Sequence, residues 1–130
     1  MAHIRAKIQR VLYKIEMHTP TNNVIIADEP TSMGGNDLGF SPKELLAASL
    51  SACTLATLRM YLDHKGWDVS EINVETDLIE NEGKAVFKRV LHFEGTLTEE
   101  QRKRLLAVAN ACPVHKLLAA GASFETTLND

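Results

Sequence analysis

Cys53 and Cys112 are the residues of this 130-residue chain with the clearest capacity for chemistry. Two thiols that meet in a fold can be oxidised to a disulfide and reduced again, whereas a lasting structural bridge is not expected in a reducing compartment. The plainer interpretation is that both cysteines are small buried hydrophobes, because free cysteine is among the residue types most often buried. Their surroundings must decide between a redox pair and core packing.

Cys112 stands directly before Pro113. A residue that precedes proline is disfavoured in a helix, so the sequence predicts a helix break at Cys112 and a new helix that begins at Pro113. Unpaired N–H groups at a helix start favour a thiolate there. His115 follows at a spacing that can bind metal, but the other histidines (His3, His18, His64, His92) do not cluster with it, and we expect neither a metal nor a cofactor.

Cys53 lies in the middle of a predicted helix over Pro42–Lys65. Ser41 and Glu44 form a capping box at its start, and Gly66 supplies the left-handed stop at its end. A thiol in mid-helix gains little from the helix dipole and resists ionisation among Leu and Ala side chains, so it needs a cation from elsewhere.

Arg10 is one candidate for that cation, because it occupies a position where the alternation of Ile4, Ala6 and Ile8 would point it inward. Arg59 lies on the same helix as Cys53, but more than half a turn round from it. The plainer interpretation of Arg59 is a solvated side chain or a partner for an acid.

Alternating and helical patterns divide the rest of the chain into elements. Before the Pro42–Lys65 helix, the sequence predicts one bulged strand or two strands over His3–Met17 with a change near Arg10, a strand over Val24–Asp28 and a loop over Glu29–Phe40. After that helix it predicts a hairpin of Val69–Ile79 with Ala85–Leu97 and a helix after the capping box at Thr98–Gln101. A short helix from Pro113 to Gly121 and a final strand over Ala122–Leu128 complete the predicted elements. The order β-β-α-β-β-α-α-β, with strands joined by hairpins, indicates the α+β class. A loop as long as Glu29–Phe40 is typically functional.

Composition limits the range of functions. A chain of 130 residues with 45% hydrophobic and 24% charged residues predicts one soluble domain over residues 1–130. A formal charge of −3 disfavours nucleic acid as a partner. Polar residues interrupt the apolar stretches, and the start has no apolar signal core, so we expect no membrane span and a cytoplasmic protein.

The Pro42–Lys65 helix carries apolar residues all round. Such a helix is buried on all sides. The few strands predicted for this chain cannot surround it alone, so we expect a second copy to cover the remaining face in a symmetric homodimer.

The phrase Gly39–Thr54, which reads GFSPKELLAASLSACT, together with the phrase Cys112–His115, resembles the OsmC/Ohr family of osmotically inducible and organic-hydroperoxide-resistance proteins. The resemblance implies an OsmC-like α+β fold, with antiparallel sheets wrapped around a long buried central helix in an intertwined homodimer. It also implies a thiol-dependent peroxidase: Cys53 attacks a small, in particular organic, hydroperoxide, and Cys112 resolves the sulfenic acid as a disulfide that a dithiol reductant then reduces.

Two features differ from the peroxidase branches that the chain resembles. Those branches carry a Glu directly after the helix-opening Pro, paired with an Arg from the preceding strand-and-loop region. Here that position is Lys43, and the loop Glu29–Phe40 has no Arg. The alternative is therefore a non-catalytic dimeric module that binds a small apolar or thiol-reactive ligand. Cysteines that merely fill the core remain a third interpretation.

Overall fold

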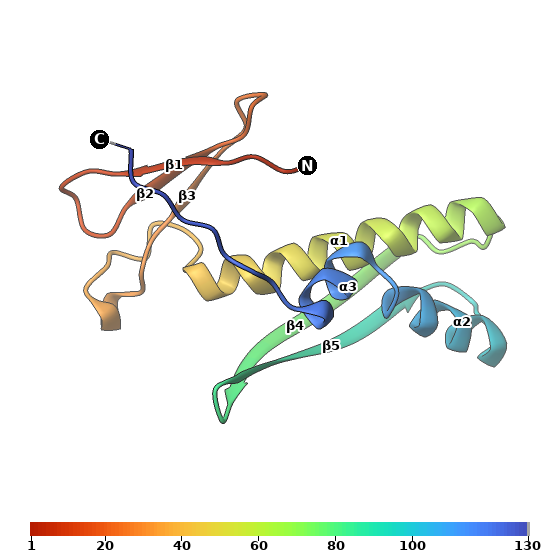
Figure 1. Ribbon diagram of the computed structural model, residues 1–130. Coiled ribbons are helices and arrows are strands. Elements are labelled where there is room, and N and C mark those ends of the chain that lie inside the picture. Colours follow the sequence, from red (N-terminus) through yellow and green to blue (C-terminus); the bar gives the residue numbers. More distant parts are fainter. Residues whose placement is uncertain (130) are drawn as a thin grey trace. The chain divides into compact units, whose positions relative to one another are not determined.

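The computed structural model, shown in Figure 1, describes residues 1–129 of the chain. These form two compact units, residues 1–47 and residues 48–129. The α+β class predicted from the sequence is confirmed, while the single domain over 1–130 stays a prediction.

The first unit contains a three-stranded antiparallel sheet. Its strands are β1 (Arg5–Ile8), β2 (Ile15–His18) and β3 (Val24–Ala27), in the order β1-β2-β3. Two strands, and not one bulged strand, therefore form before residue 20, and the change of pattern near Arg10 marks the turn between them. Each hairpin links neighbours in sequence, as the alternating pattern predicts.

The carboxylate of Asp28 organises the loop that follows β3. Its Oδ1 accepts hydrogen bonds from the N–H groups of Tyr13 and Glu29, and its Oδ2 from those of Asn36 and Leu38. Asp28 has no exposed surface. Burial raises the pKa of its carboxyl, but these four hydrogen bonds lower the pKa by more, so it lies below its ordinary value.

Asp28→Asn is expected to open this loop, because an amide has one acceptor oxygen and would turn an NH₂ group against two backbone donors. The Asn36 and Leu38 amides should exchange with solvent at least about tenfold faster in the variant, as NMR hydrogen exchange would measure. Asp37→Asn makes the same change in the same loop and should leave both amides protected. Unchanged exchange in Asp28→Asn would contradict this role.

Because the pKa of Asp28 is lowered in the fold, its contribution to stability is present above the ordinary Asp value of 3.8 and is lost as the pH falls through the lowered value. Acid should therefore narrow the stability difference between the wild type and Asp28→Asn. Urea unfolding at a series of pH values would measure this. A difference that widens on acidification would show that the sign is wrong.

Helix α1 (Pro42–Lys65) has the predicted bounds. Ser41 and Glu44 close the capping box, with Ser41 N–H donating to Glu44 Oε1 at 2.9 Å and Glu44 N–H to Ser41 Oγ at 3.3 Å. The helix stops at Gly66, whose φ of 70° is left-handed. These signals are local in sequence, which is why the prediction was accurate.

Only one line of α1 is buried within the chain, at Leu50, Thr54, Leu58 and Leu62. These residues lie four apart and so fall on one face. Met60 is 70% exposed. The expectation of burial on all sides is therefore not met by the chain alone. By length and mean hydropathy α1 would also pass as a membrane span, a test that core helices of soluble proteins pass as well.

Against this buried line lies the β4–β5 hairpin of the second unit (Figure 1). Strands β4 (Glu71–Asn81) and β5 (Lys84–Glu94) are antiparallel, and Glu82 and Gly83, both at positive φ, form the turn. Helices α2 (Glu99–Ala109) and α3 (Pro113–Ala120) follow, separated by the predicted break at Cys112. The core of this unit consists of Leu58, Leu62, Val69, Phe93, Leu105 and Ala109.

The predicted final strand over Ala122–Leu128 is wrong: these residues form no strand or helix. Phe124 is 87% exposed and Leu128 is 86% exposed. A strand needs a neighbouring strand to accept its backbone hydrogen bonds, and residues 1–129 pair none with this segment. The alternating pattern alone could not supply that partner.

Candidate functional site

Cys53 lies on α1 and is half-buried, with a free thiol. Its neighbour one turn further along is Thr57, whose Oγ1 lies 4.0 Å from Cys53 Sγ. The helix places Cys53 one residue before the buried Thr54, so the sulfur lies at the edge of the line that α1 buries. It is therefore partly accessible from outside the protein core.

Cys112 occupies the break between α2 and α3 and is fully buried. It is the N-cap residue of α3, with extended backbone, and Pro113 takes the first helical position. The N–H of His115 donates to Cys112 Sγ over 3.4 Å. The helix start thus directs an otherwise unpaired N–H group at the sulfur, as the sequence predicted.

The two thiols lie near each other. Both cysteines are free, and the side chain of Cys53 donates a hydrogen bond to Cys112. The residues are far apart in sequence, and they come together because α1 runs past the start of α3. The pairing that the resemblance implies stays a prediction, between two thiols that the fold brings near each other.

Arg89, on β5, is the cation of this site. Its guanidinium donates to four groups: Nη1 to Thr54 Oγ1 at 2.9 Å and to the Ala109 carbonyl at 3.1 Å, and Nη2 to Asn110 Oδ1 at 3.1 Å and to His115 Nδ1 at 2.5 Å. Because arginine only donates, His115 Nδ1 must be the acceptor, which assigns the ring proton to Nε2. Arg89 therefore holds together α1, the end of α2 and the start of α3.

Thr54 links this cation to the buried sulfur. Its Oγ1 accepts from Arg89, donates to the Leu50 carbonyl at 2.7 Å and lies 3.8 Å from Cys112 Sγ. The hydroxyl has one proton for two acceptors. Rotation of that proton from Leu50 toward Cys112 would add a donor to a thiolate without moving a heavy atom.

Burial raises the pKa of the Cys112 thiol and is the largest single influence on it. The N–H of His115, the Thr54 hydroxyl, the Cys53 thiol and the charge of Arg89 act in the opposite direction. Together they outweigh burial, and the pKa of Cys112 lies below its ordinary value. The surroundings thus favour a thiolate at Cys112.

A cavity of about 240 Å³ adjoins these groups. It is lined by Leu50, Ala85, Phe87, Arg89, His115, Leu118 and Ala119. Arg89 and His115 are its polar residues, and both also belong to the thiol site. A small molecule with an apolar body could therefore lie beside the thiol pair.

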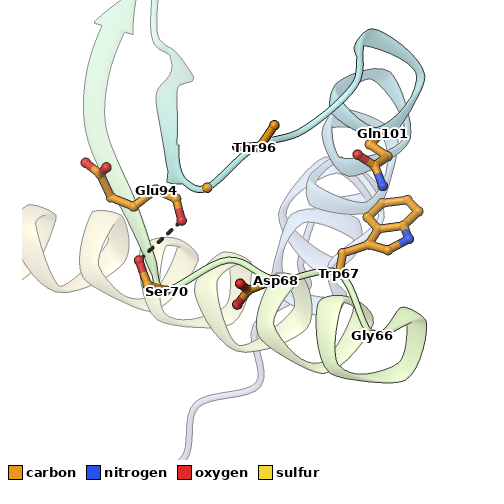
Figure 2. Close-up of a pocket in the computed structure, with 8 residues that line it drawn as sticks. Gly66, Trp67, Asp68, Ser70, Glu94, Thr96 and Gln101 are labelled. Carbon is orange, nitrogen blue, oxygen red and sulfur yellow. Dashed lines mark hydrogen bonds between the residues drawn. The ribbon is translucent and has the colours of Figure 1, made fainter.

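A second, larger cavity, of about 560 Å³, lies near the end of α1, where Trp67, Asp68, Ser70, Glu94 and Gln101 are among its lining residues (Figure 2). The hydroxyl of Ser70 donates to the Glu94 carbonyl at 3.3 Å across it. Its residues include two carboxylates but no cysteine, histidine, lysine or arginine. Size therefore does not identify the reactive site here.

The predicted cation Arg10 lies in the exposed turn between β1 and β2, in the unit that does not contain the cysteines. Its role stays a prediction. Arg59 contacts the Val69 carbonyl at 2.9 Å and Asp63 at 3.8 Å, so its plainer interpretation is confirmed.

Sequence reasoning missed Arg89, Thr54 and His115 as partners of the sulfur. A signal for Arg89 was present, because the half-buried face of β5 carries Phe87, Arg89, Leu91 and Phe93 in alternation. A cation among inward-facing apolar residues needs a buried partner. Nothing in the sequence names that partner, which the fold alone brings near.

The sequence model of the family described as OsmC-like protein matches residues 34–127. The chain belongs to this family. No curated protein matches the chain in sequence.

Solved structures agree with this membership. A protein from Psychrobacter arcticus, provisionally named as an osmotic stress induced and detoxification response protein, is 25% identical with a TM-score of 0.78, over 89% of this chain and 87% of that one. An organic hydroperoxide resistance protein from Elizabethkingia anophelis is 20% identical with a TM-score of 0.67, over 89% and 86%. One from Legionella pneumophila is 22% identical with a TM-score of 0.60, over 89% and 87%. The last two likenesses show the OsmC-like fold.

Proposed function

We propose that this OsmC-like protein reduces organic hydroperoxides with the thiols of Cys53 and Cys112 and ends each turnover with a disulfide between them. The observation that carries the proposal is the nearness of two free thiols, one of them fully buried, with the guanidinium of Arg89 held beside the buried one through Thr54 and His115. The chain belongs to the OsmC-like family, and organic hydroperoxide resistance proteins share its fold, which supports the same chemistry.

The reaction proceeds in two steps. The sulfur of Cys53 attacks the outer oxygen of the hydroperoxide, the O–O bond breaks, and the alcohol leaves with a proton, so that Cys53 becomes a sulfenic acid. Cys112 then attacks the sulfur of Cys53, an S–S bond forms, and the expelled hydroxide takes a proton to become water. The two thiols supply the two electrons that reduce the peroxide.

A dithiol reductant would return the disulfide to two thiols by exchange, with its own sulfurs oxidised in turn. A reducing cytoplasm supplies reductants of this class, and we place the reaction there.

Distant sulfurs with no cation nearby would favour the alternative of a non-catalytic binding module. The contact between Cys53 and Cys112 and the position of Arg89 support the redox reaction instead.

Thiol counting after addition of one equivalent of cumene hydroperoxide tests the proposal. The wild type should lose two thiols per peroxide, and faster than with hydrogen peroxide, because the adjoining cavity favours an apolar body. Cys53→Ser should form no peroxide-dependent disulfide. Undiminished turnover in Cys53→Ser would remove Cys53 from the mechanism.

The cavity makes a separate prediction about selectivity. Leu118→Glu places a carboxylate in its wall and should slow the reaction with cumene hydroperoxide by about tenfold or more, since a charge opposes entry of an apolar group. The reaction with hydrogen peroxide should change little. Leu117→Glu is the matched control, because Leu117 is 70% exposed and does not line the cavity. Equal losses for both peroxides in Leu118→Glu, measured as rates of peroxide consumption, would exclude this cavity as the substrate site.

A further inference from the structure

We propose that Cys112 is the proton acceptor that activates Cys53, so that one sulfur carries the negative charge of the pair and the other attacks the peroxide. This inference rests on the peroxidase function proposed above. It adds a role for Cys112 before the disulfide forms.

The charge belongs on Cys112 because α1, β5 and α3 each present a donor or a cation toward that sulfur. The titratable side chains near it are Cys53 from α1 and Arg89 from β5, while His115 of α3 presents its backbone N–H to the sulfur and its ring to Arg89. Only Arg89 among these is a permanent cation. Its guanidinium is fixed by four hydrogen bonds, so the positive charge is held in place beside the sulfur.

Cys53 is the attacking sulfur because it is the more accessible of the two. Cys112 has no exposed surface, whereas Cys53 is half-buried. Among the described residues, the structure gives Cys53 Sγ two polar partners, the Thr57 hydroxyl at 4.0 Å and Cys112. Neither is a cation. A thiol without a cation needs a base to take its proton, and the sulfur to which it already donates a hydrogen bond is that base.

The proton balance of the step follows. As Cys53 Sγ bonds to the outer peroxide oxygen, its proton passes to the Cys112 thiolate, and the O–O bond breaks to leave an alkoxide. The alkoxide takes the proton from Cys112 and departs as the alcohol. Cys112 is again a thiolate, and it is then the nucleophile that attacks the sulfenic acid on Cys53. The negative charge on Cys112 therefore takes part in both steps, first by accepting the proton of Cys53 and then by attacking the sulfenic acid.

Two measurements on Cys53→Ser and Cys112→Ser test the inference. Serine is a good N-cap residue and can accept the His115 N–H, so the second variant keeps the start of α3. The first measurement is thiolate absorbance near 240 nm as a function of pH, without peroxide. Cys53→Ser should keep a thiolate that titrates below an ordinary thiol, and Cys112→Ser should lose it.

The second measurement is the first turnover with cumene hydroperoxide at several pH values, followed by loss of the peroxide. Cys112→Ser should be slowed at least about tenfold at pH 7, and its rate should rise with pH, because hydroxide must then take the proton that Cys112 no longer accepts. A wild-type rate and pH profile in Cys112→Ser would show that Cys112 only resolves, and would overturn the inference while leaving the proposed function intact. A wild-type first turnover in Cys53→Ser would make Cys112 the attacking sulfur and would also overturn it. Failure of the wild type itself to consume the peroxide would overturn the proposed function.

Discussion

Arg89→Met is expected to slow the first turnover with cumene hydroperoxide at pH 7 by about ten- to a hundredfold. Arg89 acts on Cys112 through its charge and through the Thr54 hydroxyl and His115 that it holds in place, and about 1.4 kcal/mol of lost thiolate stabilisation corresponds to a factor of ten. The substitution removes the positive charge beside Cys112 and leaves Thr54, Asn110 and His115 without their shared donor. The pKa of Cys112 should rise, so the rate–pH profile should move to higher pH.

Two further variants separate this effect from a general loss of structure. Arg89→Lys keeps the charge but lacks the planar fork, and should recover part of the rate at pH 7. Arg102→Met removes an exposed arginine from α2 and should behave as wild type. An Arg89→Met protein with the wild-type profile would show that the thiolate needs no cation from β5.

Ala56→Arg is expected to convert a dimer into a monomer. On the second-unit part of α1, the residues opposite the buried line are exposed, among them Ala52, Ala56 and Met60. An exposed apolar strip on a helix of this mean hydropathy is expected to be buried in an interface, and we propose that a second copy of the chain forms that interface. A long charged side chain at Ala56 would prevent close approach of the two helices.

Light scattering coupled to gel filtration would measure the change. The wild type should have twice the 14.4 kDa mass of one chain, and Ala56→Arg should have the mass of one. Ala107→Arg, which makes the same change at an exposed position of α2, should stay dimeric. A monomeric wild type, or one that partitions into phosphatidylcholine vesicles, would contradict assembly through this face.

Features set by neighbours in sequence were predictable. The capping box at Ser41 and the stop at Gly66 gave the bounds of α1, and Pro113 gave the break at Cys112. In each case the signal and the structure that it directs lie within a few residues of each other.

Features that depend on a distant partner were not predictable. The prediction of a final strand was wrong because an alternating pattern cannot provide a neighbouring strand, and Phe124 remains exposed. Arg89 was missed because Thr54 and His115 reach it only through the packing of α1 and α3 on β5. The role of Arg10 as a cation for Cys53 stays a prediction, because alternation in one strand carries no information about which distant residues Arg10 would face.

The sulfur pairing was predicted from the resemblance of two short phrases and not from geometry. The fold supplies the geometry by passing Cys53 of α1 beside the N-cap of α3. It also adds a feature that the phrases do not contain, namely a lowered pKa at the second cysteine, Cys112.

Peptide mapping by mass spectrometry after reaction with one equivalent of cumene hydroperoxide, with free thiols blocked by alkylation, tests the central claim most directly. The account predicts one dominant product, a peptide pair joined through Cys53 and Cys112 within a single chain, which a dithiol returns to two alkylatable thiols. Recovery of both cysteines as alkylated thiols after the peroxide has had time to react, or of bridges that join different chains only, would contradict it.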